Sequence, residues 1–235
     1  MPKWPKTPPP MTEEQARISD DWMKYWLGVF PSRYGAFVRF NHAYAGRRAR
    51  KGQRVLDIGA GLGEHLAWEV APSDEYHAIE LRPEIAEELR RRHPHVKVVV
   101  GDCQQRIPYP DASFDRVLAI HVLEHLPDLP AALREIHRTL APGGELVVVI
   151  PCEGGIVYRI GRNLTSRRLF EKRYSMSYDF FIENEHVNHA DEVLHELAAL
   201  FEVRDATYFP FRIPSIALNV AIGLVLEPRR APWRI

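Results

Sequence analysis

The sequence predicts an α/β fold, a doubly wound parallel sheet, on three observations. Short apolar runs that suit strands buried on both faces alternate about five times with helical segments. A glycine-rich turn follows the first of these strands, as it does in many folds of this class. The chain of 235 residues is long enough for one large domain or two small ones.

Composition excludes several other classes of protein. The 31 Lys and Arg residues balance 31 Asp and Glu residues, which argues against nucleic acid or an anionic membrane as an electrostatic partner. Cys103 and Cys152 form no CxxC motif, so we expect a reducing, cytoplasmic location. The sequence has no apolar run long enough for a transmembrane helix, and its first ten residues lack the apolar core of a secretory signal.

Residues 1–50 are expected to form an N-terminal arm and a helical cap. Five prolines among the first ten residues predict an extended, mobile arm. Thr12 and Gln15 have the spacing of a capping box that opens a helix. The aromatic and apolar residues that follow at helical spacing are Ile18, Trp22, Tyr25 and Trp26. Pro31 and Gly35 interrupt this pattern before a second aromatic segment.

Residues 51–235 are expected to form the main domain. Strands are predicted at 54–58, 76–80, 96–100, 114–120 and 145–150. Helices are predicted at 64–70, 83–92 and 130–140, and from about 188 onward. After Pro151 the alternation lapses for more than thirty residues, which predicts a lid inserted at about 154–188. The apolar stretch 213–226 is interpreted as the last strands and core, with a membrane-surface contact as a weaker alternative.

Three motifs fall at the carboxyl ends of the predicted strands, where ligands bind in open α/β sheets. Asp57 precedes the glycines of the segment 59–63, Glu80 ends the second strand, and Asp102 follows the third. The sixth position of a dinucleotide fingerprint would be Glu64, whose charge would repel a diphosphate. These acids favour a cofactor that carries an ammonium group.

The segment 51–152 resembles class I S-adenosylmethionine-dependent methyltransferases of type 11, the group that includes ubiquinone-biosynthesis enzymes. The matching stretches are VLDIGAGLGEH, the acid that ends the second strand, GDCQQRIPYPDASFDRVLAIHVLEHL and LREIHRTLAPGGELVVVIP. The resemblance implies a Rossmann-like sheet of seven strands, the last antiparallel. It also implies S-adenosylmethionine as the cofactor and S-adenosylhomocysteine as the product.

By motif match, the resemblance assigns residues to the cofactor. The loop of Gly59, Ala60, Gly61 and Gly63 would pass under the methionine part, and Glu80 would bind the ribose. Asp102 would bind the adenine amino group. His121 would face the cofactor near the reacting centre. The full cofactor-binding set is Asp57, Gly59, Ala60, Gly61, Gly63, Glu80, Leu81, Asp102, Cys103 and His121.

Two groups of histidines raise further questions. His121, Glu124 and His125 match the H-x-x-E-H zinc motif, but Pro127 leaves room for about one helical turn, so no metal is expected. His186 and His189 follow the lid, and one of them is expected to contact the methyl acceptor, with a role as base left open. The alternative is that Asn188 caps a helix here and the histidines are only surface polar residues.

The lid is rich in cations. Between 154 and 176 only Glu171 opposes six basic residues: Arg159, Arg162, Arg167, Arg168, Lys172 and Arg173. This excess indicates either an anionic acceptor or a solvated lid paired with acids elsewhere. Some of the aromatic residues Trp22, Tyr25, Trp26 and Tyr34 are expected to line the acceptor pocket.

The expected function is transfer of a methyl group to the oxygen or nitrogen of a small molecule by in-line displacement. The alternatives are a cofactor-binding regulatory subunit without catalysis and an RNA methyltransferase. Nucleic acid is the weaker partner, because no RNA-binding module accompanies the basic lid and the net charge is zero. The sequence names neither the acceptor nor the oligomeric state.

Overall fold

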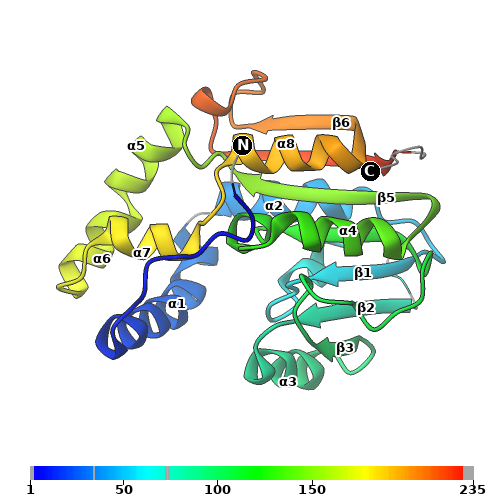
Figure 1. The fold of residues 1–235 in the computed structure, drawn as a ribbon, viewed down its shortest axis with the longest axis horizontal. Helices are drawn as coiled ribbons and strands as arrows, with labels where there is room; N and C mark the ends of the chain where they lie inside the picture. The colour runs from blue at the N-terminus through cyan, green and yellow to red at the C-terminus, as the bar shows by residue number, and fades with distance from the viewer. Residues whose placement is uncertain (1–2, 34, 72, 74, 230–235) are drawn as a thin grey trace.

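The computed structural model describes residues 3–33, 35–71, 73 and 75–229, and for residues 26–33 only the backbone. A sheet of seven strands runs through the molecule in the order β3-β2-β1-β4-β5-β7-β6 (Figure 1). The strands are β1 (Arg54–Ile58), β2 (Glu75–Glu80), β3 (Lys97–Val100), β4 (Phe114–Ile120), β5 (Leu140–Pro151), β6 (Phe201–Phe209) and β7 (Ala221–Pro228). Strands β1 to β5 pair in parallel, and β7 is antiparallel to both of its neighbours. The predicted fold class, with its antiparallel last strand, is confirmed.

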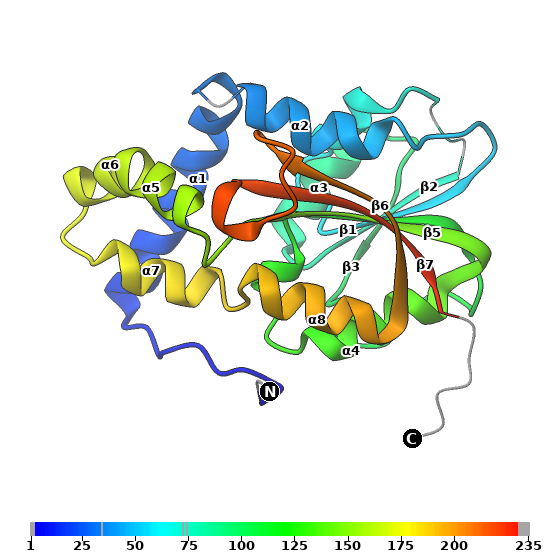
Figure 2. The ribbon, with the colours of Figure 1, turned by 90° about the horizontal axis from the view of Figure 1, so that it is seen from above.

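Helices cover both faces of the sheet (Figure 2). One face carries α2 (Gly35–Gly46) and α3 (Pro83–Arg92), whose Tyr44, Ala45 and Leu89 pack in one buried cluster with residues of the sheet. The other face carries α4 (Leu129–Thr139) and α8 (Ala190–Leu200), which share the larger core. Burial on both faces explains why the central strands are apolar without alternation.

The N-terminal segment follows its predicted pattern in part. Helix α1 (Glu13–Arg33) opens with the predicted capping box, since Thr12 and Gln15 exchange hydrogen bonds between side chain and backbone N–H. The arm before it is extended, yet it is held against the domain. The Lys6 ammonium contacts Glu192 at 2.7 Å, and the Trp4 indole donates to Glu196 on α8.

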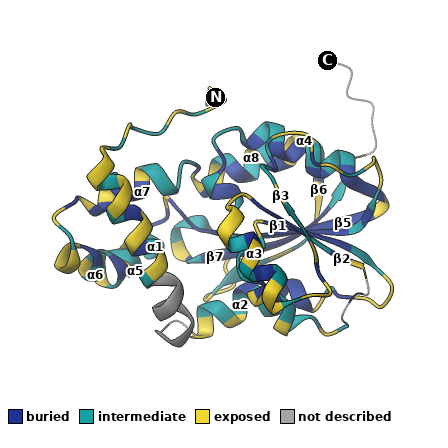
Figure 3. Ribbon diagram, turned by 90° about the horizontal axis from the view of Figure 1, so that it is seen from below, coloured by how far each residue is buried: buried dark blue, intermediate teal, exposed yellow. Residues whose placement is uncertain are grey.

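The predicted lid consists of three helices, α5 (Ile156–Leu164), α6 (Ser166–Arg173) and α7 (Tyr178–Glu185). Together with α1 they form a lobe beside the sheet that has its own buried centre (Figure 3). Trp22 of α1 is 2% exposed and meets the rings of Phe170 and Phe181 edge-on. The lid is therefore packed against the N-terminal helix rather than standing free in solvent.

Three short 3₁₀ turns complete the chain: η1 (Glu64–Trp68), η2 (Leu123–His125) and η3 (Ile216–Leu218). The prediction of a helix at 64–70 was wrong, because this segment forms only the short 3₁₀ turn η1. Its end is packed closely against α2, where a Cβ on Gly46 would lie 2.1 Å from the carbonyl oxygen of Trp68. Among the described residues, no helix has both the length and the apolar character needed to cross a membrane.

Candidate functional site

A glycine loop follows β1 at the carboxyl end of the sheet. Gly59, Gly61 and Gly63 have φ angles of 64°, 55° and 83°, which residues with a Cβ rarely adopt. Gly59 also touches the segment after β4, because a Cβ there would lie 2.7 Å from Cγ2 of Val122. Half-buried Ala60 packs toward the core under the loop. The loop can therefore bring its backbone close to a ligand.

Glu80 and Leu81 stand next to this loop at the end of β2. The carboxylate of Glu80 is buried, and it accepts hydrogen bonds from the backbone N–H of Gly61 at 3.2 Å and from Nε of Arg82 at 3.1 Å. Leu81 is 62% exposed, which is unusual for a large apolar side chain. An acceptor for hydroxyl groups thus lies beside an apolar surface.

The segment after β3 adds a further acid. The carboxylate of Asp102 accepts hydrogen bonds from the backbone and the side-chain amide of Gln104. Cys103 is buried beside it. Burial, together with the negative charge of Asp102, raises the pKa of the Cys103 thiol to about 12. The thiol therefore stays protonated at neutral pH and is a poor nucleophile.

Asp57 lies beneath the glycine loop instead of lining an open surface. It is 3% exposed and accepts a hydrogen bond from the hydroxyl of Tyr76 at 2.9 Å. Burial raises its pKa to about 6, although His65 and the hydroxyl of Tyr76 partly oppose this change. Asp57 therefore offers little surface for contact with a ligand.

A cavity of about 770 Å³ lies between the sheet and the lobe formed by α1 and the lid. Glu64, which follows Gly63, and His121, which follows β4, both line it, so the cavity adjoins the glycine loop. Much of the remaining wall is apolar or aromatic, with side chains such as Trp22, Phe37, Val38, Trp68, Tyr158, Phe181 and Ile182. The described lining includes three glutamates and neither Lys nor Arg.

The polar end of this cavity begins at His121. This residue has a positive φ of 53°, which turns it off the end of β4. Its Nδ1 lies 3.1 Å from Oε1 of Glu124, and its Nε2 is buried without a partner among the described residues. Burial alone would raise the pKa of Glu124, but the hydrogen bond of His121 and the nearby His125 and His186 lower it to about 2. Glu124 is therefore a carboxylate at neutral pH.

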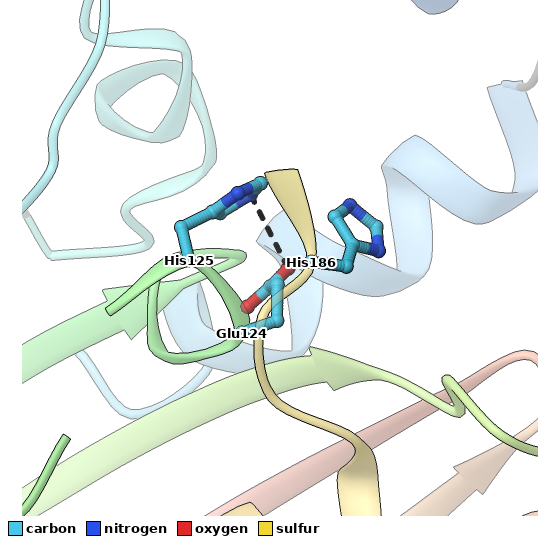
Figure 4. A group of neighbouring side chains, drawn as sticks. All are labelled: Glu124, His125 and His186. Atoms are coloured by element: carbon cyan, nitrogen blue, oxygen red, sulfur yellow. Dashed lines mark ion pairs between the residues drawn. The ribbon is translucent and has the colours of Figure 1, made fainter. Parts of the chain in front are cut away.

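His125 and His186 approach this carboxylate from two distant parts of the sequence (Figure 4). Nε2 of His125 lies 3.9 Å from Oε1 of Glu124, and the rings of the two histidines are 4.9 Å apart and nearly perpendicular. Nδ1 of His186 contacts Oε2 of Glu153 at 2.9 Å. Sequence reasoning missed the grouping of Glu124, His125 and His186, because no local pattern relates η2 to the end of the lid.

The two histidines predicted to contact the acceptor are separated by the fold. His186 lines the cavity. His189 is exposed and caps α8, where its backbone N–H donates to Glu192. Asn188, the other predicted cap, is instead buried and donates to the carbonyl oxygens of Leu123 and Leu126, which ties the end of the lid to η2.

Several lid cations pair with acids. Arg162 binds Glu153 at 2.6 Å, Arg167 contacts Asp179 and Glu171, and Arg173 binds Asp21. None of the six basic lid residues lines the cavity. Of the aromatic residues expected at an acceptor pocket, Trp22 lines the cavity, and Tyr25 packs on Trp22 without lining it. Tyr34 and the side chain of Trp26 lie outside the described residues.

Comparison with known proteins matches this part of the chain to a family. Residues 56–148 match the family described as "Methyltransferase domain". Over 100 residues the chain is 38% identical to a malonyl-[acyl-carrier protein] O-methyltransferase of Halorhodospira halophila, covering 40% of this chain and 34% of that protein. It is 36% identical over 100 residues to a demethylmenaquinone methyltransferase of Beutenbergia cavernae, which covers 43% of this chain and 41% of that protein. The chain thus spans well under half the length of these relatives.

The fold is also shared beyond the matched segment. A crystal structure of a protein from Pyrococcus horikoshii aligns with a TM-score of 0.62 at 17% identity, covering 88% of this chain and 99% of that one. At that identity the likeness speaks for the fold alone. The family match covers the glycine loop and the strands β2 to β4 that carry the acids and His121. Residues 56–148 therefore match the methyltransferase-domain family, in agreement with the resemblance that the motifs carry.

Proposed function

We propose that the chain is an S-adenosylmethionine-dependent methyltransferase whose small-molecule acceptor binds in the cavity of about 770 Å³. The observation that carries this proposal is that the cavity meets the glycine loop at Glu64 and the end of β4 at His121. A donor held by the loop would thus present its methyl group to a molecule in the cavity. Alignment of donor and acceptor is the main demand of this reaction, because the sulfonium is already activated.

The residues around the loop fit the cofactor. The backbone at Gly61 and the carboxylate of Glu80 lie together as polar groups, and exposed Leu81 offers an apolar surface for a planar ring. We propose that Glu80 binds the ribose hydroxyls and that Asp102, beside buried Cys103, binds the adenine amino group. The carboxylate of Glu64 suits the positive charge of a sulfonium.

The lining of the cavity favours an uncharged, partly aromatic acceptor over the anionic acceptor considered from the sequence. Its described walls are rich in aromatic rings, and their charged residues are glutamates. The cations of the lid lie elsewhere, and Arg162, Arg167 and Arg173 are paired. A carboxylated or phosphorylated acceptor would therefore meet like charge near its reacting end.

His121 is the group best placed to take a proton from a hydroxyl acceptor. With Nδ1–H donated to the carboxylate of Glu124, Nε2 keeps its lone pair. With the cofactor bound, the acceptor oxygen would bond to the methyl carbon as the C–S bond breaks, and that electron pair would stay on sulfur. The proton would pass to Nε2 of His121, and S-adenosylhomocysteine would leave. His186, at the end of the lid helix α7, contacts the polar end of the acceptor.

The first test of this function is calorimetric titration with S-adenosylhomocysteine, with NAD as the control ligand. One-to-one binding of the first and none of the second is expected. Acceptors are then screened with donor labelled in the methyl group, comparing neutral phenols and alcohols with their carboxylated analogues. Failure to bind S-adenosylhomocysteine would contradict the proposal, and turnover restricted to the anionic acceptors would overturn the assignment of an uncharged one.

A second test concerns the histidines. His121→Ala is expected to lower kcat by about 10²–10⁴-fold, the usual contribution of general base catalysis, while S-adenosylhomocysteine still binds. His186→Ala is expected to raise the KM for the acceptor. His195→Ala changes an exposed residue of α8 and serves as the matched control. An unchanged kcat in His121→Ala would show that the proton leaves by another route.

We also propose a cytoplasmic location, because Cys103 and Cys152 are both buried and form no disulfide.

A further inference from the structure

Three side chains at the polar end of the cavity lie close enough together to hold a metal ion. Glu124, His125 and His186 each offer one ligand atom, and these atoms all lie within 4.8 Å of one another (Figure 4). Two histidines and one glutamate are the protein ligands of one type of catalytic zinc site. All three residues line the same cavity, so a position facing that space stays open to another ligand.

Hydrogen bonds behind the histidines set the tautomers that such a centre needs. Nδ1 of His125 lies 2.6 Å from the backbone carbonyl oxygen of Glu185, so this nitrogen carries the proton. Nδ1 of His186 faces the carboxylate of Glu153, which Arg162 holds in turn at 2.6 Å. In both rings Nε2 is left with its lone pair. A carboxylate or a backbone carbonyl behind each metal-binding histidine is the usual supporting arrangement in metalloproteins.

Glu124 supplies a second, independent observation. Its side chain is 2% exposed, and Oε1 is the oxygen nearest His121 and His125. Oε2 is buried and has no hydrogen-bond partner among the residues that the structure describes. An ionised carboxylate oxygen left unpaired in the interior is costly, and a bound cation would remove that cost.

We propose that Glu124, His125 and His186 bind one first-row divalent cation, of which Zn²⁺ is the representative. Metal–ligand distances of about 2.0–2.2 Å require the three atoms to draw in by about an ångström or less, which side-chain rotation can supply. The motif in the sequence pairs His121 with His125, but in the fold the second histidine ligand is His186. His121 is left to its contact with Oε1 of Glu124.

In this arrangement the cation takes the acceptor's hydroxyl oxygen as its further ligand and lowers the pKa of that hydroxyl. The contact of His186 with the acceptor then runs through the cation. This consequence rests on the proposed function, whereas the site itself rests only on the geometry of the three side chains.

The test is titration of the tag-free, metal-stripped protein with Co²⁺, followed by its visible absorption, and with Zn²⁺, followed by calorimetry. One equivalent of each ion is expected to bind. His186→Ala and Glu124→Gln should abolish this one-equivalent binding, and Glu153→Gln should weaken it by about 10–100-fold through loss of the group behind His186. His195→Ala and His95→Ala, which change exposed histidines elsewhere, should bind like the wild type.

Two results would overturn the site: no stoichiometric binding by the wild type, or equal dissociation constants for the wild type and His186→Ala. Glu124 is buried, so if Glu124→Gln fails to fold, the partly exposed His186 carries the decision alone. Binding of S-adenosylhomocysteine is measured on the same samples and separates the two proposals. The protein can bind S-adenosylhomocysteine without binding the metal ion, and it can bind the metal ion without binding S-adenosylhomocysteine.

Discussion

At the scale of single residues, charge buried beneath the glycine loop is the feature with the clearest consequence for stability. Asp57 is almost fully buried, and the folded protein holds its pKa near 6 against a usual value of 3.8. The folded state therefore binds the proton more tightly than the unfolded state does. The contribution of Asp57 to stability is greatest below pH 4 and is lost as the pH rises through 6.

Replacing Asp57 by Asn should remove this dependence. A difference of about two pKa units corresponds to about 3 kcal/mol, so relative to the wild type the variant should gain about that much stability between pH 4 and pH 7. The measurement is urea unfolding of both proteins at several pH values. Other carboxylates titrate alike in both proteins and cancel in the comparison. A difference that stays constant with pH would contradict the prediction.

At the scale of elements, the contact between α2 and the sheet depends on glycines that leave room for it. A Cβ on Gly223 of β7 would lie 2.5 Å from the ring of Tyr44 on α2. That ring cannot easily withdraw, because it is buried and its hydroxyl is hydrogen-bonded to Asp205 at 3.2 Å. The close approach of helix and strand places α2, which carries several residues of the cavity wall.

Gly223→Ala should therefore destabilise the protein by about 1–3 kcal/mol, the usual cost of overpacking a core. Gly161→Ala is the matched control, because Gly161 lies in α5 with nothing within 4 Å of an added Cβ. Alanine there should leave the stability unchanged or raise it by up to about 1 kcal/mol. Denaturant unfolding compares the two, and equal stabilities would contradict the steric argument.

At the scale of the whole molecule, the sheet has a buried cluster on each face and the lobe has a buried cluster of its own. The lobe joins α1 to α6 and α7 around Trp22, although these segments are more than a hundred residues apart in sequence. The cavity lies where the two parts meet. The lobe has the smaller core, so we expect it to open more readily than the sheet.

Trp22→Ala should loosen this lobe as a unit. Loss of a buried tryptophan costs about 3–5 kcal/mol, here mainly in the lobe. Hydrogen exchange should quicken in α1, α6 and α7, while β4 and β5 stay protected. Lys24→Ala, an exposed change on the same helix, is the control. Faster exchange spread evenly over the sheet would show instead that lobe and sheet unfold together.

Local patterns predicted most of the sheet and the cofactor side of the candidate site. The strands at 54–58 and 114–120 and the helix at 83–92 have the predicted bounds. Their burial produces a pattern of apolar residues that can be recognised within a few neighbouring positions. The helix predicted at 64–70 does not form, because close packing of this segment against Gly46 overrides its helical pattern. The three helices of the lid were not predicted one by one, since the core that α6 and α7 share depends on Trp22 far upstream.

The sequence alone was enough to predict the fold class, the resemblance of the central segment to methyltransferases, and the positions of the glycine loop, Glu80 and Asp102 at strand ends. These features follow from short-range spacing. Long-range packing, in contrast, brings His186 to Glu124 and His125, leaves His189 as a helix cap, and pairs several lid cations with acids. Such contacts join residues up to 152 positions apart, and their geometry comes from packing that no local spacing encodes.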